Sequence, residues 1–438
     1  MATIKPFRGT RYNPEEIEDL SKVISQPYDR VRHGLQEKYY DQSPHNVVRI
    51  IKGKEKAEDD DENNVYTRAR EYYETWLDKG VLMREEQPAL YVLRQSFTLP
   101  DGTEKTRQGL VSAFQLSTFD EGVVLPHERT HSGPKVDRLN LMRATQVNFG
   151  HIFMLYPGDR INDLLNTAVE QTEGLEARDL FEKDVLQQFW PVTEAAIVEG
   201  VLEEMAPKQN LIIADGHHRY ETALNYRDEM RKKHPDAPPN AGFNFRMVTM
   251  VSMEDPGLVI LPTHRLIHSY GKMSAGEILE QATAYFNLIP VAGREELEAA
   301  LDEATPDHPR FGFYSGGYHV LQLKDPDVMD RLLSRRDPAW RMLDVTVLHE
   351  LLIERVMGIS PEAVERKENI EYLRDPQMGY DAVDEGEAEF LFVLNPTRME
   401  QVRACTAAGE KMPQKSTDFY PKVISGMVMM PIGVDERL

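Results

Sequence analysis

Short apolar runs alternate with amphipathic segments between residues 86 and 270. The runs that predict strands are 151–156, 189–192, 211–214 and 245–251. The segments that predict helices carry an apolar residue every three or four positions, and they are 161–173, 194–205 and 220–232. This alternation is typical of an α/β sheet covered by helices.

Other patterns flank this middle stretch. Before it we expect a helix entered at residues 13–16, a second helix over 64–79, and a hairpin of runs 90–99 and 105–116 around Asp101-Gly102. Beyond residue 270 longer amphipathic helices are expected over 275–285, 294–303 and 344–356, with strands near 310–314 and 390–394. The chain is therefore expected to be α/β (α+β) and to have three parts. These are an N-terminal lobe over 1–85, a core over 86–270, and a C-terminal α+β lobe over 271–438.

Charge and composition narrow the classes of partner. Among the 438 residues, 73 are acidic and 51 are basic, which gives a formal net charge of -22. Such a charge disfavours broad attraction to nucleic acid or anionic lipid, so any phosphate must be held locally. The acidic run 59–62 is expected to be a solvated loop. The single cysteine, Cys405, excludes an intramolecular disulfide and a cysteine-built zinc site.

No apolar run approaches the ~20 residues of a membrane span, and the first residues lack the apolar segment of a signal peptide. We therefore expect a cytoplasmic protein with no membrane partner and no nucleic-acid partner. The oligomeric state is left open.

The most informative segment is 211–220, where an apolar run meets a turn glycine and a group of anion-binding side chains. A strand is expected to end at Ala214 and a helix to start near His217, with Gly216 free to adopt a positive φ. The N–H groups and the dipole of a helix start suit a phosphate. The side chains that can add donors are His217, His218 and Arg219. Asp215 is expected to cap the helix or to hold a magnesium ion.

A second group of charged residues lies at 125–143. Val136, Leu139 and Met142 recur at helical spacing and predict a helix that starts after Gly133. Lys135 and Arg138 then lie in its first turn, where cations oppose the helix dipole. Two interpretations stay open: both side chains point into solvent, or a bound anion makes the turn a complementary site.

The pattern H-E-x-x-H, formed by His127, Glu128 and His131, is also that of zinc proteases. Zinc binding would need both histidines on one stable helix, but Pro126 precedes the pattern and Gly133-Pro134 follows it at once. A loop that holds His127 and Glu128 is the better prediction. A zinc hydrolase remains a less favoured alternative.

Three further segments are candidates for substrate or lid residues. The first is the polar stretch of Lys415, Ser416, Thr417, Tyr420 and Lys422, which either closes over a site or forms a self-bonded loop. The others are His264 and Arg265, which follow an apolar run where ligands often approach a sheet, and the turn residues Tyr28 and Asp29.

Several motifs together resemble those of domain-of-unknown-function family 1015. They are P-F-R at 6–8, P-Y-D at 27–29, P-H-E-R-T at 126–130, G-P-K-V-D-R-L at 133–139, D-G-H-H-R-Y-E-T-A-L at 215–224, D-P-G-L-V-I-L-P-T-H-R-L at 255–266, N-P-T at 395–397 and M-P-Q-K-S-T-D-F-Y-P-K at 412–422. The resemblance covers nearly the whole chain, and the motifs are in the right order.

The pair P-H-E and D-G-H-H-R is also similar, more distantly, to the free serine kinases of the ParB/sulfiredoxin-like superfamily. That resemblance implies a ParB/sulfiredoxin-like core that binds ATP or ADP with Mg²⁺ and phosphorylates the hydroxyl of a small metabolite, with free L-serine as the first guess. Glu128 then corresponds to the general base, with His127 and Arg219 beside it in the catalytic set. The phosphate loop corresponds to Asp215, Gly216, His217, His218 and Arg219.

A non-catalytic nucleotide-binding regulatory protein is the main alternative. The other branches of the superfamily fit less well, because sulfiredoxin chemistry needs a cysteine where this chain has His217, and DNA clamps need a basic surface. Turnover separates the two main hypotheses, since a sensor would bind nucleotide and form no product.

Overall fold

The computed structural model describes residues 1–32, 34–128, 134–170 and 173–438, with Pro134 and Lys135 described by their backbone. The chain divides into two compact units. Unit 1 comprises Met1–Pro126, Thr130–Val259 and Pro421–Leu438, and unit 2 comprises His127–Arg129 and Ile260–Tyr420. The expected division at residues 85 and 270 stays a prediction.

Unit 1 is built on a mixed nine-stranded sheet with the order β6-β11-β8-β12-β5-β4-β10-β9, in which β1 pairs with β5. The strands are β1 (Ile4–Lys5), β4 (Leu90–Thr98), β5 (Glu104–Gln115), β6 (Val124–Pro126), β8 (Ile152–Tyr156), β9 (Leu175–Arg178), β10 (Leu186–Val192), β11 (Leu211–Asp215) and β12 (Phe245–Ser252). β11 runs parallel to β6 and antiparallel to β8, while β12 runs parallel to β8. The expected hairpin is confirmed as β4 and β5.

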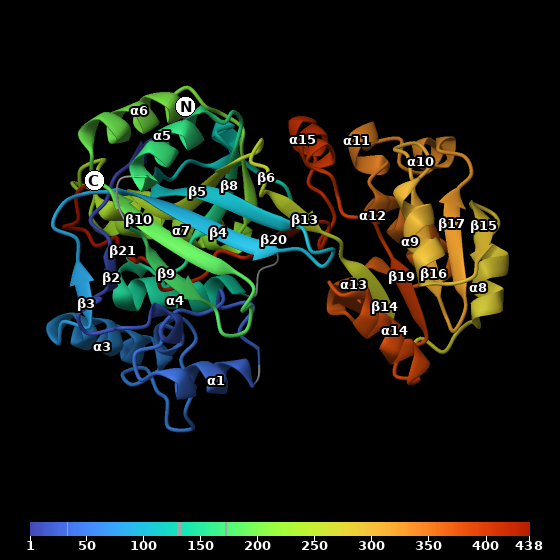
Figure 1. Ribbon diagram of the computed structural model, residues 1–438, viewed down its shortest axis with the longest axis horizontal. Helices are drawn as coiled ribbons and strands as arrows, with labels where there is room; N and C mark the ends of the chain where they lie inside the picture. The colour runs from blue at the N-terminus through green and yellow to red at the C-terminus, as the bar shows by residue number, and fades with distance from the viewer. Residues whose placement is uncertain (33, 129–133, 171–172) are drawn as a thin grey trace. The chain divides into compact units, whose positions relative to one another are not determined.

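Helices cover this sheet on both sides. They are α1 (Leu35–Gln42), α2 (Val48–Ile51), α3 (Val65–Asp78), α4 (Pro134–Thr145), α5 (Arg160–Val169), α6 (Ala195–Met205) and α7 (His217–Lys233), with the short η1 (Leu20–Lys22), η2 (Phe119–Glu121) and η3 (Gly242–Asn244). Figure 1 shows α5 and α6 on one side of the sheet and α3 and α4 on the other. Two small strand pairs complete unit 1, β2 (Thr10–Tyr12) with β3 (Leu82–Arg84) and β7 (Val147–Asn148) with β21 (Met430–Pro431).

The helix expected from residues 13–16 is wrong. The segment after Asn13 forms turns, and η1 follows. The Asn13 N–H donates to the Val81 carbonyl at 2.9 Å, and its amide nitrogen donates to the Gly80 carbonyl at 3.0 Å. Pairing with a distant segment therefore fixes this backbone, which the local proline and glutamates could not reveal.

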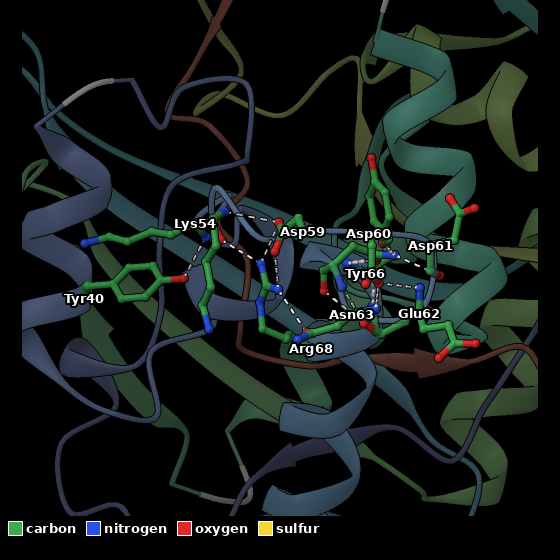
Figure 2. Close-up of polar contacts among 12 residues, drawn as sticks. Tyr40, Lys54, Asp59, Asp60, Asp61, Glu62, Asn63, Tyr66 and Arg68 are labelled. Carbon is green, nitrogen blue, oxygen red and sulfur yellow. Dashed lines mark hydrogen bonds and ion pairs between the residues drawn. The ribbon is translucent and has the colours of Figure 1, made fainter.

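The acidic run 59–62 lies in a loop, as expected; Asp60, Asp61 and Glu62 are exposed, Asp59 is partly buried, and local polar contacts hold the run in place (Figure 2). The two oxygens of Asp59 accept from the guanidinium of Arg68 at 2.6 and 2.9 Å. The side chain of Asp60 accepts from the N–H groups of Glu62 and Asn63. These contacts lead into the N-cap of α3, so the run stabilises a helix start.

Unit 2 contains an antiparallel six-stranded sheet with the order β15-β17-β16-β19-β14-β18. Its strands are β14 (His264–Ile267), β15 (Phe286–Val291), β16 (Arg310–Tyr314), β17 (Tyr318–Leu323), β18 (Ile370–Leu373) and β19 (Phe390–Val393). The strands β13 (Val259–Leu261) and β20 (Asp418–Tyr420) form a separate pair. The helices are α8 (Ala275–Ala282), α9 (Arg294–Asp302), α10 (Asp327–Leu332), α11 (Pro338–Arg341), α12 (Asp344–Val347), the π-helix η4 (Leu348–Val356), α13 (Pro361–Arg366), α14 (Pro376–Asp384) and α15 (Met399–Ala407).

Successive residues of these strands enter two different cores. Phe390 and Phe392 of β19 pack in the core that also holds residues of α8 and η4, whereas Leu391 and Val393 pack with residues of α9 and α14. This is the two-residue period of a strand buried on both faces. The protein is therefore of mixed α/β class, with a sheet and helices in each unit. Across the described residues, no helix is both long and apolar enough to cross a membrane.

Candidate functional site

The strand-turn-helix expected at 211–220 is present in unit 1. β11 is apolar and buried up to Ala214, Gly216 adopts φ 93°, and α7 starts at His217. A Cβ on Gly216 would lie 3.1 Å from Nε of Arg219. Glycine is thus favoured here both by the left-handed backbone and by the close approach of the guanidinium.

Asp215 and Arg219 form an ion pair across this turn. Nη2 of Arg219 donates to Oδ2 of Asp215 at 3.0 Å, and Nη1 donates to the carbonyl of His151. The other carboxylate oxygen of Asp215 accepts from the Gly216 N–H at 2.9 Å. The expectation that Asp215 caps α7 is wrong, because the N-cap residue is Gly216 and no side chain caps the helix start.

The surroundings of Asp215 are strongly basic. Four groups whose charges act on its carboxylate are Lys422, Arg219, His217 and Arg30. Burial raises the pKa of Asp215, but these charges outweigh it and hold the pKa well below its usual range. Burial also lowers the pKa of Arg219, and Asp215 and Asp29 outweigh that effect and raise it. This turn therefore holds a charged pair inside a surplus of positive charge.

A small cavity of about 40 Å³ lies beside Arg219. Its polar lining comes from α4, α7, β12 and two loops and includes Tyr28, Arg138, Arg219, Thr222, Arg246 and Ser425. The remaining wall is mostly apolar and includes Ile51, Leu141, Met142, Val147 and Phe149. Three arginines thus face one small space whose other wall is mostly apolar.

Arg138 is held in place and does not point freely into solvent. Its guanidinium donates to Oδ2 of Asp137 at 2.9 and 2.6 Å and to the Ile51 carbonyl at 2.8 Å, and it lies 4.1 Å from the ring centre of Tyr28. The expected helix is α4, although Val136 is 65% exposed and does not belong to the core. Lys135 belongs to α4, and its side chain lies outside the described part of the structure.

Tyr28 and Asp29, which were expected only to approach a cleft, lie close to these charges. Tyr28 lines the cavity, and burial raises the pKa of its hydroxyl, with Arg219 acting in the opposite direction. Asp29 lies close enough to Arg219 to raise its pKa. The turn after Pro27 therefore joins the same site as the D-G-H-H-R loop.

Sequence reasoning missed Arg246 and His151. Arg246 on β12 is 5% exposed, donates from Nη2 to the Gly150 carbonyl at 2.7 Å, and has a buried Nε without a partner. Burial, Arg219 and Arg138 lower the pKa of Arg246 to about 9. The one available signal was an arginine inside the apolar run 245–251, because burial of a charge costs free energy unless the charge is paired.

His151 lies close enough to Arg219 and Arg246 for both charges to act on its imidazole. Its Nδ1 is 2.9 Å from Oγ1 of Thr249, and its Nε2 is buried without a partner. Burial, Arg219 and Arg246 lower the pKa of His151 to about 3, so the imidazole is neutral at physiological pH.

In unit 2, His127 and Glu128 are extended chain, as the loop interpretation predicted. Glu128 forms a parallel bridge with Met412. Oε1 of Glu128 accepts from the N–H of Thr417 at 3.3 Å and from its hydroxyl at 3.2 Å. That hydroxyl is also 2.7 Å from Nε2 of His127, which is 1% exposed. Glu128 and Thr417 are thus brought together although 289 positions separate them.

Arg265 joins this part of unit 2. Its Nη2 donates to the Lys415 carbonyl at 3.1 Å, and its Nε is 3.3 Å from Nε2 of His349. Burial lowers the pKa of Arg265 to about 10, while Tyr372 and Glu128 act to raise it. His264 is buried, accepts from the Leu394 N–H at 3.2 Å, and has a pKa lowered to about 4 by burial and by Arg265.

The remaining residues of the polar stretch hold their own segment. Oγ of Ser416 donates to the Pro413 carbonyl at 2.5 Å, and the carbonyl of Ser416 accepts from Thr397. Tyr420 lies under the guanidinium of Arg374, whose carbon is 4.9 Å from the ring centre. Only the contact between Ser416 and Pro413 lies within the segment, so the choice between a lid and a self-bonded loop stays a prediction. Lys422 lies instead in unit 1, beside Asp215.

Within the described residues, no group of three or more His, Cys, Asp and Glu side chains could hold a metal ion. His131 lies outside those residues, so the zinc alternative stays untested. The basic groups around Asp215 fit an anion better than a magnesium ion held by the protein alone.

The fold and site define a mixed α/β protein with an arginine-lined cavity beside a strand-turn-helix. The model of the family "Protein of unknown function (DUF1015)" matches residues 4–346, and the chain belongs to that family. No curated protein matches the chain in sequence.

Solved structures show a weak likeness. A conserved hypothetical protein from Pyrococcus furiosus is 12% identical with a TM-score of 0.32, and the match covers 72% of this chain and 94% of that chain. A free serine kinase in complex with AMP is 12% identical with a TM-score of 0.34, over 72% of this chain and 90% of that one. SbnI with a C-terminal truncation, from Staphylococcus aureus, is 10% identical with a TM-score of 0.34, and the match covers 74% of this chain and 87% of that one.

Proposed function

We propose that this protein transfers a phosphoryl group from ATP or ADP to the hydroxyl of a small metabolite, with free L-serine as the first acceptor to test. The proposal includes a ParB/sulfiredoxin-like core and a cytoplasmic location. One observation carries it: Asp215, Gly216 and Arg219 form an ion-paired turn at the start of α7, inside a surplus of positive charge.

Phosphoryl transfer needs positioning and charge neutralisation more than covalent help from the protein. The N–H groups at the start of α7 and the basic groups His217, His218, Arg30 and Lys422 would hold the phosphates. The ion pair with Asp215 fixes the guanidinium of Arg219. Mg²⁺ would arrive with the nucleotide, and no step depends on Asp215 as a metal ligand.

Glu128 is the proposed general base. During transfer the acceptor oxygen forms a bond to phosphorus, the bond from phosphorus to the nucleotide oxygen breaks, and the acceptor proton moves to the Glu128 carboxylate. Thr417 orients that carboxylate through its N–H and hydroxyl. His127 is buried, so we assign it a positioning role on Thr417 in place of contact with substrate.

Phosphorus NMR tests the proposal directly. The full chain is incubated with Mg²⁺, ATP or ADP, and L-serine, beside Glu128→Gln. A new phosphomonoester signal in the native protein that is lost in Glu128→Gln would support a kinase with this base. Glu280→Gln is the matched control, because Glu280 is an exposed glutamate of unit 2.

The other outcomes separate the alternatives. Tight nucleotide binding that Arg219→Ala abolishes, with no product from L-serine or from a panel of hydroxylated metabolites, would replace the kinase with a regulatory nucleotide-binding protein. An unchanged signal in Glu128→Gln would remove Glu128 as the base.

A further inference from the structure

The cavity of unit 1 contains a charge that the proposed phosphate loop does not explain. Arg219 is paired with Asp215 and Arg138 is paired with Asp137. Arg246 has no such partner: among the described residues, the charged or titratable groups that act on its pKa are Arg219, Tyr28 and Arg138, and none is a carboxylate. The cavity therefore presents one uncompensated buried cation.

The bonding of Arg246 leaves donors available. Its described hydrogen bond runs from Nη2 to the Gly150 carbonyl, and its Nε is buried without a partner. An unpaired buried donor on a charged group costs more free energy than an ordinary hydrogen bond contributes. Such a cost is expected where a ligand supplies the missing acceptor.

The size and lining of the cavity limit what that ligand is. A space of about 40 Å³ has room for a few water molecules and for one small charged group, but not for a nucleoside. The apolar side of the cavity, formed by Ile51, Met142 and Phe149 among others, strengthens any charge pairing inside it. A guanidinium presents a planar fork that matches a carboxylate.

We propose that this cavity is a carboxylate-binding site of unit 1 that borders the phosphate loop. Arg246, which is not part of that loop, is its main ligand, and Arg138 and the loop residue Arg219 are its flanking charges. Tyr28, Thr222 and Ser425 place hydroxyl-bearing side chains on the same lining. The bound group is the carboxylate of a small metabolite. The site rests on the cavity alone and holds whether or not the protein transfers phosphate.

Thermal unfolding of the full chain tests the site with defined probes at constant ionic strength. The probes are acetate, L-serine, ethanolamine, inorganic phosphate and chloride. Ethanolamine matters because it is L-serine without the carboxylate. We expect acetate and L-serine to raise the melting temperature of the native protein, and ethanolamine and chloride to leave it unchanged. A rise with phosphate and none with either carboxylate would overturn the assignment.

Two variants of Arg246 separate a ligand from a structural role. In Arg246→Met the uncompensated charge is gone, so the protein without probe melts at the same or a higher temperature, while the carboxylate-dependent rise is lost. In Arg246→Lys the charge remains but the fork is absent, so carboxylate affinity falls about tenfold. A variant that melts lower than the native protein and keeps the full carboxylate-dependent rise would overturn the proposal.

Measurements of nucleotide binding distinguish a failure of the carboxylate site from a failure of the proposed function. Calorimetric titration with ADP should give the same affinity in Arg246→Met as in the native protein. A loss of ADP binding in that variant would make the cavity part of the phosphate site and would overturn the separate carboxylate site. Failure of ADP to bind the native protein would count against the kinase and leave the carboxylate result standing.

The same variants identify the source of the carboxylate. If it belongs to the acceptor, Arg246→Met raises the KM for that acceptor and leaves ADP affinity unchanged. If it belongs to a regulator, acetate changes the affinity for ADP in the native protein, and ADP changes the affinity for acetate by the same factor.

Discussion

The turn at Asp215 in unit 1 and the segment at Glu128 in unit 2 differ in the charges that surround their carboxylates. Around Asp215, several buried charges hold one another, and the pKa values of Asp215, Arg219 and Arg246 all depart from their ordinary values. Around Glu128, one carboxylate accepts from the uncharged Thr417, whose hydroxyl also contacts His127, and a single buried guanidinium, that of Arg265, responds to its charge. The first arrangement suits binding an anion, and the second suits moving a proton. Substitutions in unit 1 should therefore act mainly on stability and binding, whereas those in unit 2 should act mainly on rate.

The sharpest test of this contrast is Arg219→Ala. The substitution removes one partner of a pair in which the Arg219 side chain is 7% exposed and the Asp215 side chain 26% exposed. Loss of a buried partner costs about 3 kcal/mol of unfolding free energy, at the low end of its range because Asp215 is partly solvated. Urea unfolding of the full chain measures it.

Arg160→Ala is the control for Arg219→Ala, since Arg160 is exposed and forms an ion pair with the partly exposed Glu204. That change should cost about 0–1 kcal/mol. Equal costs for the two substitutions would mean that the Asp215 turn is not the tightly coupled region described above.

The backbone conformation of both regions could be predicted from local sequence, because it depends mainly on neighbouring residues. The apolar run before Asp215, the glycine at 216 and the basic residues behind it specify a strand, a left-handed turn and a helix start. The extended chain at Glu128 followed equally from Pro126 and Gly133-Pro134. These features are fixed by backbone chemistry within a few positions.

Other parts of the contrast depend on tertiary pairing that no local pattern encodes. Arg246 lies in a strand whose neighbours are apolar, and only the sheet brings it beside Arg219. Thr417 reaches Glu128 because distant segments pair through Met412. Asp215 was expected to cap α7, but Gly216 is the N-cap residue, and the two carboxylate oxygens of Asp215 accept from the Gly216 N–H and from the Arg219 guanidinium. Residues 13–16 carry a local pattern that predicts a helix start. Asn13 instead pairs with the segment near Gly80, which lies far away in the sequence.

The charge balance of unit 1 predicts an acid response centred on His151. Its pKa lies near 3 in the folded protein, against 6.5 ordinarily, because burial, Arg219 and Arg246 all oppose a further positive charge. Well above pH 6.5 the imidazole is neutral in both states and has no effect on the free energy of unfolding. As the pH falls from 6.5 toward 3, the unfolded chain gains a proton that the folded protein does not, so the free energy of unfolding falls.

Between pH 7 and pH 5 this loss amounts to about 2 kcal/mol from His151 alone. His151→Gln should remove it, and the two proteins are compared by urea unfolding at both pH values. The other titrating groups contribute equally to both proteins. An identical loss in the variant would show that His151 protonates freely in the folded state.

A smaller effect is expected from Gly216→Ala. The φ of 93° is costly for alanine, and its Cβ would lie 3.1 Å from Nε of Arg219, so the Asp215–Arg219 pair must shift. We expect a loss of about 1–2 kcal/mol in unfolding free energy. Gly122→Ala is the matched control, because φ is 69° there and no atom lies within 4 Å of the added Cβ. A larger loss of unfolding free energy in Gly122→Ala would indicate that the Arg219 guanidinium moves away from the added Cβ at little cost.

The weakest expected effect lies in unit 2, where Thr417→Val removes the hydroxyl that contacts Glu128 at 3.2 Å and His127 at 2.7 Å. One hydrogen bond to a charged group corresponds to about a tenfold loss in turnover. Thr417→Ser keeps the hydroxyl and should retain most of the rate, and the affinity for ADP should be unchanged in both variants. Initial rates followed by phosphorus NMR, together with ADP titration, measure these effects. If Thr417→Val weakened ADP binding and left turnover intact, the Glu128 segment would be a binding region like the Asp215 turn, and the division of roles between the two regions would be wrong.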